Sequence, residues 1–260
     1  YADGGAMFGA IPKTAWKRRY PSDENNACVL AMRSLLVETD EGRIVLIDNG
    51  AGAKQTKDLT YYRFFDCIDL EEELLKRGIR LEDVTDVVLT HLHFDHCGNT
   101  TRLSLSDEYV STFPNARHWV SRRQWENFLH PHPLERDSYF PENMQAIADA
   151  GLLQLIDAET QLCSSIHLRL YDGHTSGQIV PYINTGKETL VFAGDVIPLA
   201  ASISPAWISA YDTHPLTSWH EKTCLLDEAA REKQTIIFCH DAYTSMCRVK
   251  KSGGGYSRCL

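Results

Sequence analysis

Runs of apolar residues in the first half of the chain have the length and composition of β-strands. Two of them, at 27–39 and 43–50, flank the turn-prone sequence DEG at 40–42, so they predict an antiparallel hairpin. A further apolar run at 86–90 leads directly into the sequence THLHFDHCG. The early part of the chain therefore predicts strands whose ends carry polar, chemically active side chains.

Helical spacing and capping residues mark the segments between these strands. In the sequence DLEEELLKRG, Asp69 is the expected N-cap, Glu72 its capping-box partner and Gly78 the stop signal. Further helices are expected from Ser121, from Pro141 to Gly151, and near 217–233.

Four more strands are expected in the second half, at 167–173, 178–185, 189–195 and 235–241. Two strand-rich halves separated by helices predict an α/β fold, a four-layered αββα sandwich with helices on its outer faces. A chain of 260 residues of this kind commonly forms one core, so we expect a single domain over 1–260.

Charge and hydropathy narrow the class of protein. The formal net charge is -9, with 26 Lys and Arg against 35 Asp and Glu, and the sequence contains no long basic run. Because binding to phosphate backbones needs a clustered basic surface, we expect no nucleic-acid partner. The apolar stretch at 196–211 contains Pro198 and Pro205, so we expect no membrane anchor either.

The eight cysteines are scattered and form no CxxC pair, which is unlike a disulfide scaffold. Free thiols fit a reducing compartment, so we expect a cytoplasmic protein. Because the chain starts at Tyr1 without methionine, removal of a leader is the alternative.

The sequence THLHFDHCG concentrates metal-ligand chemistry at the end of the 86–90 strand. Residues two apart in an extended chain point the same way, so His91 and His93 can converge on one ion. Asp95 and His96 follow where the strand turns, and can face a second ion. Imidazole and carboxylate together suit zinc, iron or manganese.

Three later residues follow strand-like runs in the same way: His174 in DGHTSG, Asp195 in VFAGD and His240 in IFCHD. Strand ends gathered at one edge are where ligands distant in sequence can meet. A single histidine at a strand end is more often an ordinary packed residue, and the prediction rests on the set of seven together.

This ordered set resembles the metallo-β-lactamase superfamily, over roughly residues 27–245. The resemblance implies that His91, His93 and His174 hold one metal, that Asp95, His96 and His240 hold the other, and that Asp195 bridges them. It implies two divalent ions, zinc first, with iron, manganese or cobalt as alternatives. Asp48 matches an early acidic residue of the family and is expected to support a ligand rather than to be one. Cys97, beside His96, is expected to pack near the site.

The resemblance also implies hydrolysis. A hydroxide bridging the two metals would attack a polarised carbonyl or phosphoryl group, with Asp95 and Asp195 as the catalytic carboxylates and Asp95 as a candidate proton carrier to the leaving alkoxide.

Three stretches, 3–26, 118–133 and 194–222, resemble the branch of N-acyl-homoserine lactonases and methyl-parathion-hydrolase-like enzymes. Residues 1–26 are then expected to line the active site. The substrate-binding candidates are Met7, Phe8, Trp16 and Tyr211, with core packing as the alternative for the first three.

The leading hypothesis is a lactonase that opens N-acyl-homoserine lactones, an activity that quenches quorum signals. The alternative is an organophosphate or aryl-ester hydrolase, because Pro198 stands where the best-known lactonases have a tyrosine. The expected partner is a small-molecule substrate, and a homodimer is a further expectation from the branch. A diiron redox protein is disfavoured because it needs a flavin domain, and a non-catalytic metal-binding protein is disfavoured because all seven ligand residues are present.

Overall fold

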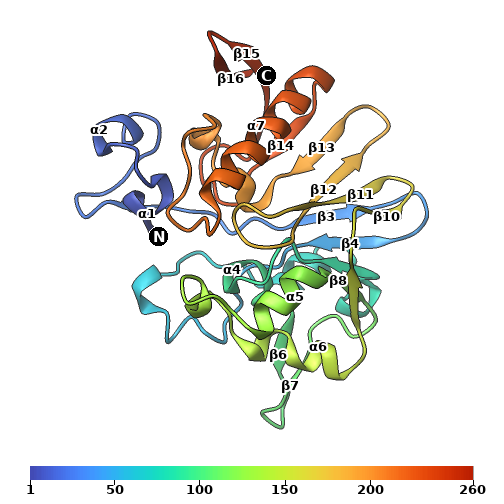
Figure 1. The fold of residues 1–260 in the computed structure, drawn as a ribbon. Helices are drawn as coiled ribbons and strands as arrows, with labels where there is room; N and C mark the ends of the chain where they lie inside the picture. The colour runs from blue at the N-terminus through green and yellow to red at the C-terminus, as the bar shows by residue number, and fades with distance from the viewer. Residues whose placement is uncertain (260) are drawn as a thin grey trace. The chain divides into compact units, whose positions relative to one another are not determined.

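A computed structural model describes residues 1–259 and divides the chain into two compact units. The first unit contains Tyr1–Ala31 and the chain from Ala158 onward, and the second contains Met32–Asp157. Figure 1 shows the elements of both units in chain order. The expectation of a single domain over residues 1–260 stays a prediction.

The first unit is built on a seven-stranded sheet of order β10-β11-β12-β13-β14-β15-β16. Its strands are β10 (Thr160–Cys163), β11 (Ile166–Tyr171), β12 (Gln178–Asn184), β13 (Thr189–Phe192), β14 (Thr235–Ile237), β15 (Met246–Ser252) and β16 (Gly255–Cys259). Neighbours run antiparallel, except that β13 and β14 are parallel, with Phe192 opposite Ile237. Residues that follow these two strands therefore emerge at the same sheet edge.

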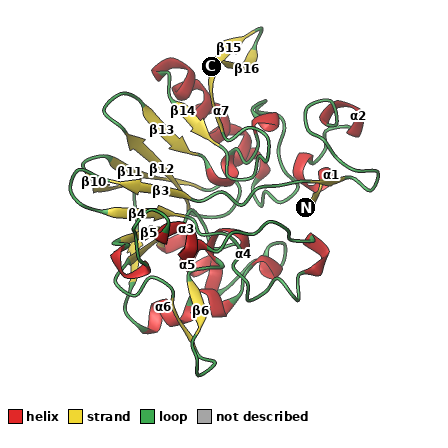
Figure 2. Cartoon of the chain, turned by 180° about the vertical axis from the view of Figure 1, so that it is seen from behind, coloured by secondary structure: helices red, strands yellow, loops and turns green. Residues whose placement is uncertain are grey.

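The long helix α7 (Pro215–Glu232) packs on this sheet (Figure 2). Leu225, Leu226 and Ala229 on its inner face share one hydrophobic cluster with Val191 of β13 and Ile236 of β14. The spacing of these helix residues by three and four gives the apolar stripe that a helix needs to cover a sheet. Short 3-10 helices, η5 (Gly194–Val196) and η6 (Ala200–Ser202), follow β13.

The N-terminal segment of the first unit folds into β1 (Ala2–Asp3), α1 (Gly4–Phe8), α2 (Lys13–Trp16) and β2 (Ala27–Cys28). Strands β1 and β2 pair antiparallel. The segment has a small core of its own, in which Phe8, Trp16 and Tyr20 pack beside Leu199. The rings of Phe8 and Trp16 stack with centroids 5.3 Å apart.

The second unit is built on a five-stranded sheet of order β3-β4-β5-β8-β9. Its strands are β3 (Leu35–Glu38), β4 (Ile44–Ile47), β5 (Asp86–Val88), β8 (Arg117–Ser121) and β9 (Leu153–Ile156). β3 and β4 form the predicted antiparallel hairpin, and β4, β5, β8 and β9 run parallel. A separate two-stranded hairpin, β6 (Thr101–Leu103) with β7 (Tyr109–Ser111), completes the strands of this unit.

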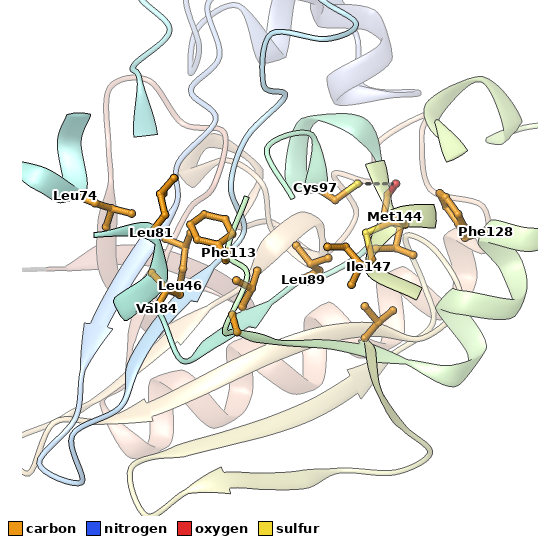
Figure 3. Packing of buried hydrophobic residues seen from close by; sticks show 14 of the residues in the cluster. Leu46, Leu74, Leu81, Val84, Leu89, Cys97, Phe113, Phe128, Met144 and Ile147 are labelled. Atoms are coloured by element: carbon orange, nitrogen blue, oxygen red, sulfur yellow. Dashed lines mark hydrogen bonds between the residues drawn. The ribbon is translucent and has the colours of Figure 1, made fainter. Parts of the chain in front are cut away.

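Helices of the second unit are α3 (Leu70–Leu75), α4 (Phe94–Cys97), α5 (Arg122–Leu129) and α6 (Gln145–Asp149), with 3-10 helices η1 (Thr60–Tyr62), η2 (Leu81–Asp83), η3 (Arg136–Ser138) and η4 (Pro141–Asn143). The predicted caps are present: Asp69 accepts from the backbone N–H of Glu72, and Ser121 from that of Gln124. Figure 3 shows the core beneath them, which includes Leu89 and Cys97.

The structure corrects two of the predicted elements and adds one hairpin. The run 27–39 is not one strand, because β2 ends at Cys28 and β3 begins at Leu35. The helix expected from Pro141 breaks at Met144 into η4 and α6. The hairpin β15–β16 at the C-terminus was not predicted, because its first strand, MCRVKKS, is mostly polar and exposed.

Within residues 1–259, no helix combines the length and the apolar character needed to cross a membrane.

Candidate metal centre

The second unit gathers three histidines of the HLHFDH sequence into one buried cluster. β5 ends at Val88, and the chain then passes through His91 to His93, which is the N-cap of the short helix α4. The ring of His91 lies 4.5 Å from that of His93 and 4.0 Å from that of His96, measured between centroids. Asp95 is on α4, and its Oδ2 lies 3.9 Å from Nε2 of His96. The predicted ligands of this segment are thus brought together.

Asp48 fixes one imidazole of this cluster. Its Oδ2 lies 2.8 Å from Nδ1 of His96, and Thr90 donates to the same carboxylate through both its backbone N–H and its hydroxyl. Because β4 and β5 are parallel, Asp48 and Thr90 emerge at the same sheet edge. A carboxylate on one imidazole nitrogen leaves the other nitrogen as the metal donor. The supporting role expected for Asp48 agrees with this contact.

Glu135 holds a second imidazole, and no local sequence pattern marks this residue. Its Oε2 lies 3.2 Å from Nε2 of His93, and the residue is 6% exposed. Asn127 and the hydroxyl of Tyr139 donate to the same carboxylate. Glu135 lies in a loop 42 residues after His93, so only the tertiary fold brings it there. His93 thus has Nδ1 as its remaining donor atom.

The loop that follows β4 forms hydrogen bonds with the backbone at the end of α4 and just after it. Asn49 donates its backbone N–H to the carbonyl of His96, and Gly98 donates to the carbonyl of Gly50. The ammonium of Lys54 donates to the carbonyls of Gly98 and Thr101. Gly98 is the C-cap of α4, where carbonyls lack helical partners, so a lysine is a suitable donor for its carbonyl.

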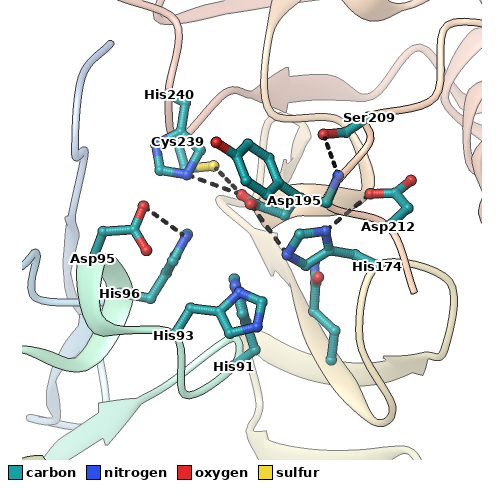
Figure 4. A network of polar contacts seen from close by, with 12 residues as sticks. His91, His93, Asp95, His96, His174, Asp195, Ser209, Asp212, Cys239 and His240 are labelled. Atoms are coloured by element: carbon teal, nitrogen blue, oxygen red, sulfur yellow. Dashed lines mark hydrogen bonds and ion pairs between the residues drawn. The ribbon is translucent and has the colours of Figure 1, made fainter. Parts of the chain in front are cut away.

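The first unit contains a second cluster, centred on Asp195. This residue lies in η5 directly after β13, and His240 follows the parallel strand β14, so both stand at one sheet edge. Figure 4 shows the contacts: Asp195 Oδ2 lies 3.3 Å from Nε2 of His174, and Oδ1 lies 3.1 Å from Nε2 of His240. One carboxylate therefore faces two imidazoles with different oxygens.

The far nitrogen of each of these imidazoles also has a partner. Nδ1 of His174 lies 2.9 Å from Oδ1 of Asp212, and Nδ1 of His240 lies 2.8 Å from the carbonyl of Ala31. These contacts point each Nε2 toward Asp195 and favour it as the ligand atom. Asp212 was missed by sequence reasoning, because nothing in the sequence AYDTHP marks it.

Cys239 adds a thiol to this cluster. Its Sγ donates to Oδ1 of Asp195 at 3.1 Å, and burial raises the pKa of the thiol far above its ordinary value. Burial alone would lower the pKa of His240, but the neighbouring Cys239 and Asp195 raise it well above its ordinary value. In the second unit, Cys97 is buried and donates to the carbonyl of Leu92, which matches the packing role expected of it.

The donor atoms present suit a divalent transition metal. Imidazole nitrogens with carboxylate oxygens are the ligand set of zinc, iron and manganese sites. Ligand atoms of Asp195, Cys239 and His240 lie within 4.8 Å of one another. Supporting carboxylates on His96, His93 and His174 are the usual partners of metal-bound histidines. The residues of both units therefore fit divalent metal ions.

The four predicted substrate contacts occupy different settings within the first unit. Phe8 and Trp16 are 0% and 2% exposed in the core of the N-terminal segment. Met7 lines a narrow hollow that also contains Asp195, while Tyr211 is 41% exposed. Substrate contact by these residues stays a prediction, with Met7 placed nearest to the cluster of Asp195.

Comparison with known proteins identifies the family to which the chain belongs. Residues 33–240 match the model of the family described as Metallo-beta-lactamase superfamily. The chain therefore belongs to the metallo-β-lactamase superfamily and has the mixed α/β fold of that family. The predicted fold class and family are confirmed.

Similar solved structures include a probable metal-dependent hydrolase from Staphylococcus aureus, 26% identical, covering 99% of this chain and 92% of that one, with a TM-score of 0.90. The hydrolase AbOPH of the beta lactamase superfamily is 21% identical, covering 99% and 89%, with a TM-score of 0.80. AidC, a dizinc quorum-quenching lactonase, is 24% identical, covering 88% and 79%, with a TM-score of 0.71. The last two likenesses are evidence of fold alone.

Among curated proteins, probable metallo-hydrolases of Mycobacterium bovis and Mycobacterium tuberculosis are each 24% identical over 181 residues. The match covers 62% of this chain and 55% of each relative, so the chain spans about half the length of these relatives.

Proposed function

We propose that the protein is a metal-dependent hydrolase, and that it is a lactonase that opens N-acyl-homoserine lactones to the corresponding hydroxy acids and so quenches quorum signals. The observation that carries the proposal is the placement of Asp195, whose two oxygens face His174 and His240 at 3.3 and 3.1 Å. A carboxylate that offers its oxygens in two directions suits a residue that bridges two ions. The dizinc quorum-quenching lactonase AidC is among the structural relatives.

We propose one ligand set from the two clusters, as the family resemblance implies. His91, His93 and His174 would hold one ion, Asp95, His96 and His240 the other, and Asp195 would bridge them. Zinc is the first choice, because imidazole and carboxylate ligands without a coordinating thiolate are common at catalytic zinc sites. When bound, the ions supply Lewis-acid polarisation of the ester carbonyl and a water of lowered pKa.

The remaining steps belong to the protein. Asp48, Glu135 and Asp212 hold the imidazoles of His96, His93 and His174 in one tautomer, which keeps the donor atoms fixed. Asp95, whose side chain is 27% exposed, would pass a proton to the leaving alkoxide. Water adds to the acyl carbon, the acyl–oxygen bond of the ring breaks, and the alkoxide takes the proton.

A second candidate function, hydrolysis of organophosphates or aryl esters, is favoured by Pro198. The residue lines the hollow beside Asp195 and has no hydroxyl to offer a lactone oxygen. The same metal chemistry serves a phosphoryl centre as well as an acyl centre.

The test is a substrate panel assayed with the full chain loaded with zinc. N-hexanoyl-homoserine lactone, a 4-nitrophenyl ester and a phosphotriester are compared by kcat/KM, and mass spectrometry identifies the ring-opened acid. Preference for the lactone is expected, and Asp195→Ala should abolish its turnover while Asp40→Asn, at an exposed turn, leaves it unchanged. Activity confined to the phosphotriester would overturn the lactonase proposal in favour of the second candidate.

We further propose a cytoplasmic location, supported by eight cysteines that are all free thiols. A homodimer also stays a proposal.

A further inference from the structure

The loop that carries His174 is short and joins two strands of the first unit. It spans residues 172–177, between the end of β11 and the start of β12. Figure 4 shows the imidazole of His174 between the carboxylates of Asp195 and Asp212. A side chain is held in place only as well as the backbone that carries it, so the contacts of this loop decide where Nε2 of His174 lies.

One carboxylate of helix α7 binds the backbone of this loop. The backbone N–H of Asp172 donates to Oε1 of Glu221 at 2.8 Å, and that of Gly173 donates to Oε2 at 2.9 Å. Glu221 therefore holds two successive N–H groups, directly before His174. Hydrogen bonds to an ionised carboxylate are roughly twice as strong as bonds between neutral groups. The side chain of Glu221 is also partly buried, where such bonds are stronger than in water.

The helix also packs directly on the loop at Gly173, where there is no side chain. A Cβ at this position would lie 2.5 Å from both the Cα and the hydroxyl oxygen of Ser218, which is far inside van der Waals contact. The backbone N–H of His214, the N-cap of α7, donates to the carbonyl of Gly173 at 2.9 Å. Gly173 is thus held at both its N–H and its carbonyl, by Glu221 and by His214.

The same segment of the chain holds His174 itself. The backbone N–H and the hydroxyl of Thr213 both donate to the carbonyl of His174 at 3.0 Å. Asp212 contacts Nδ1 of the imidazole at 2.9 Å. The chain from Asp212 to Glu221 therefore fixes both the backbone and the ring of His174, and it leaves Nε2 as the atom that can bind a metal.

We propose that Glu221 is a positioning residue, which holds this loop so that Nε2 of His174 lies at the place of one metal ion. The assignment rests on the ligand set proposed above, in which His174 holds one of two ions. The other ion is proposed to be held by Asp95, His96 and His240, none of which is in the loop. Loss of the Glu221 carboxylate should therefore weaken one ion selectively, whereas a merely structural carboxylate would not distinguish between the two.

The test measures zinc binding to the full chain by competition with a chromogenic chelator. In Glu221→Ala the affinity for one ion is expected to fall about 10-fold to 100-fold, and that for the other by less than about threefold. Glu221→Gln keeps one acceptor oxygen, so its loss should be smaller. In a His174→Ala background, Glu221→Ala should change zinc affinity no further, because the ligand that it positions is already absent. The matched control is Glu228→Ala on the same helix, which removes the partner of Arg169 and should leave both affinities unchanged.

Thermal melting of the metal-free proteins checks that the variants are folded. Glu221→Ala and Glu228→Ala each lose a carboxylate that has hydrogen-bond partners, so both are expected to melt lower than wild type, and only the first should lose metal affinity. If Glu221→Ala does not fold, Glu221→Gln replaces it, with the same selective loss at smaller size. Equal weakening of both ions, unchanged affinity, or a further loss in the His174→Ala background overturns the assignment.

Failure of the wild type to bind two ions contradicts the proposed ligand set separately. The position of His174 is then followed without metal, by NMR of the full chain with isotope-labelled histidine, in which His174→Gln identifies the signals of this ring. Signals that shift in Glu221→Ala and not in Glu228→Ala support the positioning role of Glu221. Signals that stay in place, or shift equally in both variants, overturn it.

Discussion

The carboxylate of Asp48 lies 2.8 Å from Nδ1 of His96, and Asp48 itself adopts a left-handed backbone conformation with φ of 52°. Such a conformation is unfavourable for residues other than glycine, asparagine and aspartate, which suggests that the position is kept for its side chain. The contact leaves Nε2 of His96 as the donor atom for a metal.

Replacing Asp48 should therefore weaken metal binding without removing a ligand. Asp48→Asn keeps the shape of the side chain and its tolerance of the left-handed region, but it loses the charge that orients His96. We expect metal affinity to fall about 10-fold to 100-fold, measured by competition with a chromogenic chelator. The matched control is Asp40→Asn at an exposed turn. Unchanged affinity in Asp48→Asn would contradict the supporting role.

The buried His118 should make the free energy of unfolding depend on pH. It is fully buried in β8, and burial lowers its pKa from 6.5 to about 4. Between these two values the unfolded chain binds a proton that the folded protein does not, so stability falls as the pH drops from 6.5 to 4 and then levels off. The shift corresponds to a loss of about 3 kcal/mol from this group.

Chemical unfolding of His118→Leu and wild type at a series of pH values measures this effect. The stability lost between pH 6.5 and 4 should be smaller in the variant by roughly that amount, because the ligand histidines are the same in both proteins. His130→Leu, at an exposed histidine, should behave as wild type. Parallel pH profiles for His118→Leu and wild type would refute the assignment.

Replacing Trp16 tests whether the N-terminal segment packs as a core or contacts substrate. Its ring is 2% exposed and stacks on Phe8, so Trp16→Ala should lower the free energy of unfolding by about 3–5 kcal/mol. Denaturant unfolding measures this, with Trp219→Ala on the exposed side of α7 as the control. A folded, equally stable Trp16→Ala with a raised KM for acyl lactones would show instead that this tryptophan contacts substrate.

The ligand residues of the site could be predicted because they stand in short local sequence patterns. His91, His93, Asp95 and His96 are recognisable because they are adjacent in sequence at a strand end, and His174, Asp195 and His240 because each follows a strand-like run. The parallel pairing of β13 with β14 explains why the last two share one sheet edge.

The supporting residues could not be predicted in the same way. Glu135 and Asp212 lie in loops without a local pattern, and only the tertiary fold places them on His93 and His174. The apolar residues of the N-terminal segment were ambiguous because a pocket wall and a small core need the same side chains. The structure places Phe8 and Trp16 in that core, and Met7 beside the hollow.

The most direct test of the proposed two-metal hydrolysis is reconstitution of the protein with metal. The full chain is stripped with a chelator, zinc is titrated back, and hydrolysis of N-hexanoyl-homoserine lactone is followed at each step beside the zinc content. We expect no hydrolysis without metal, and a rise that levels off at about two ions per chain, as a two-metal site requires. Full activity in the stripped protein, or a plateau at one ion per chain, would contradict the two-metal account.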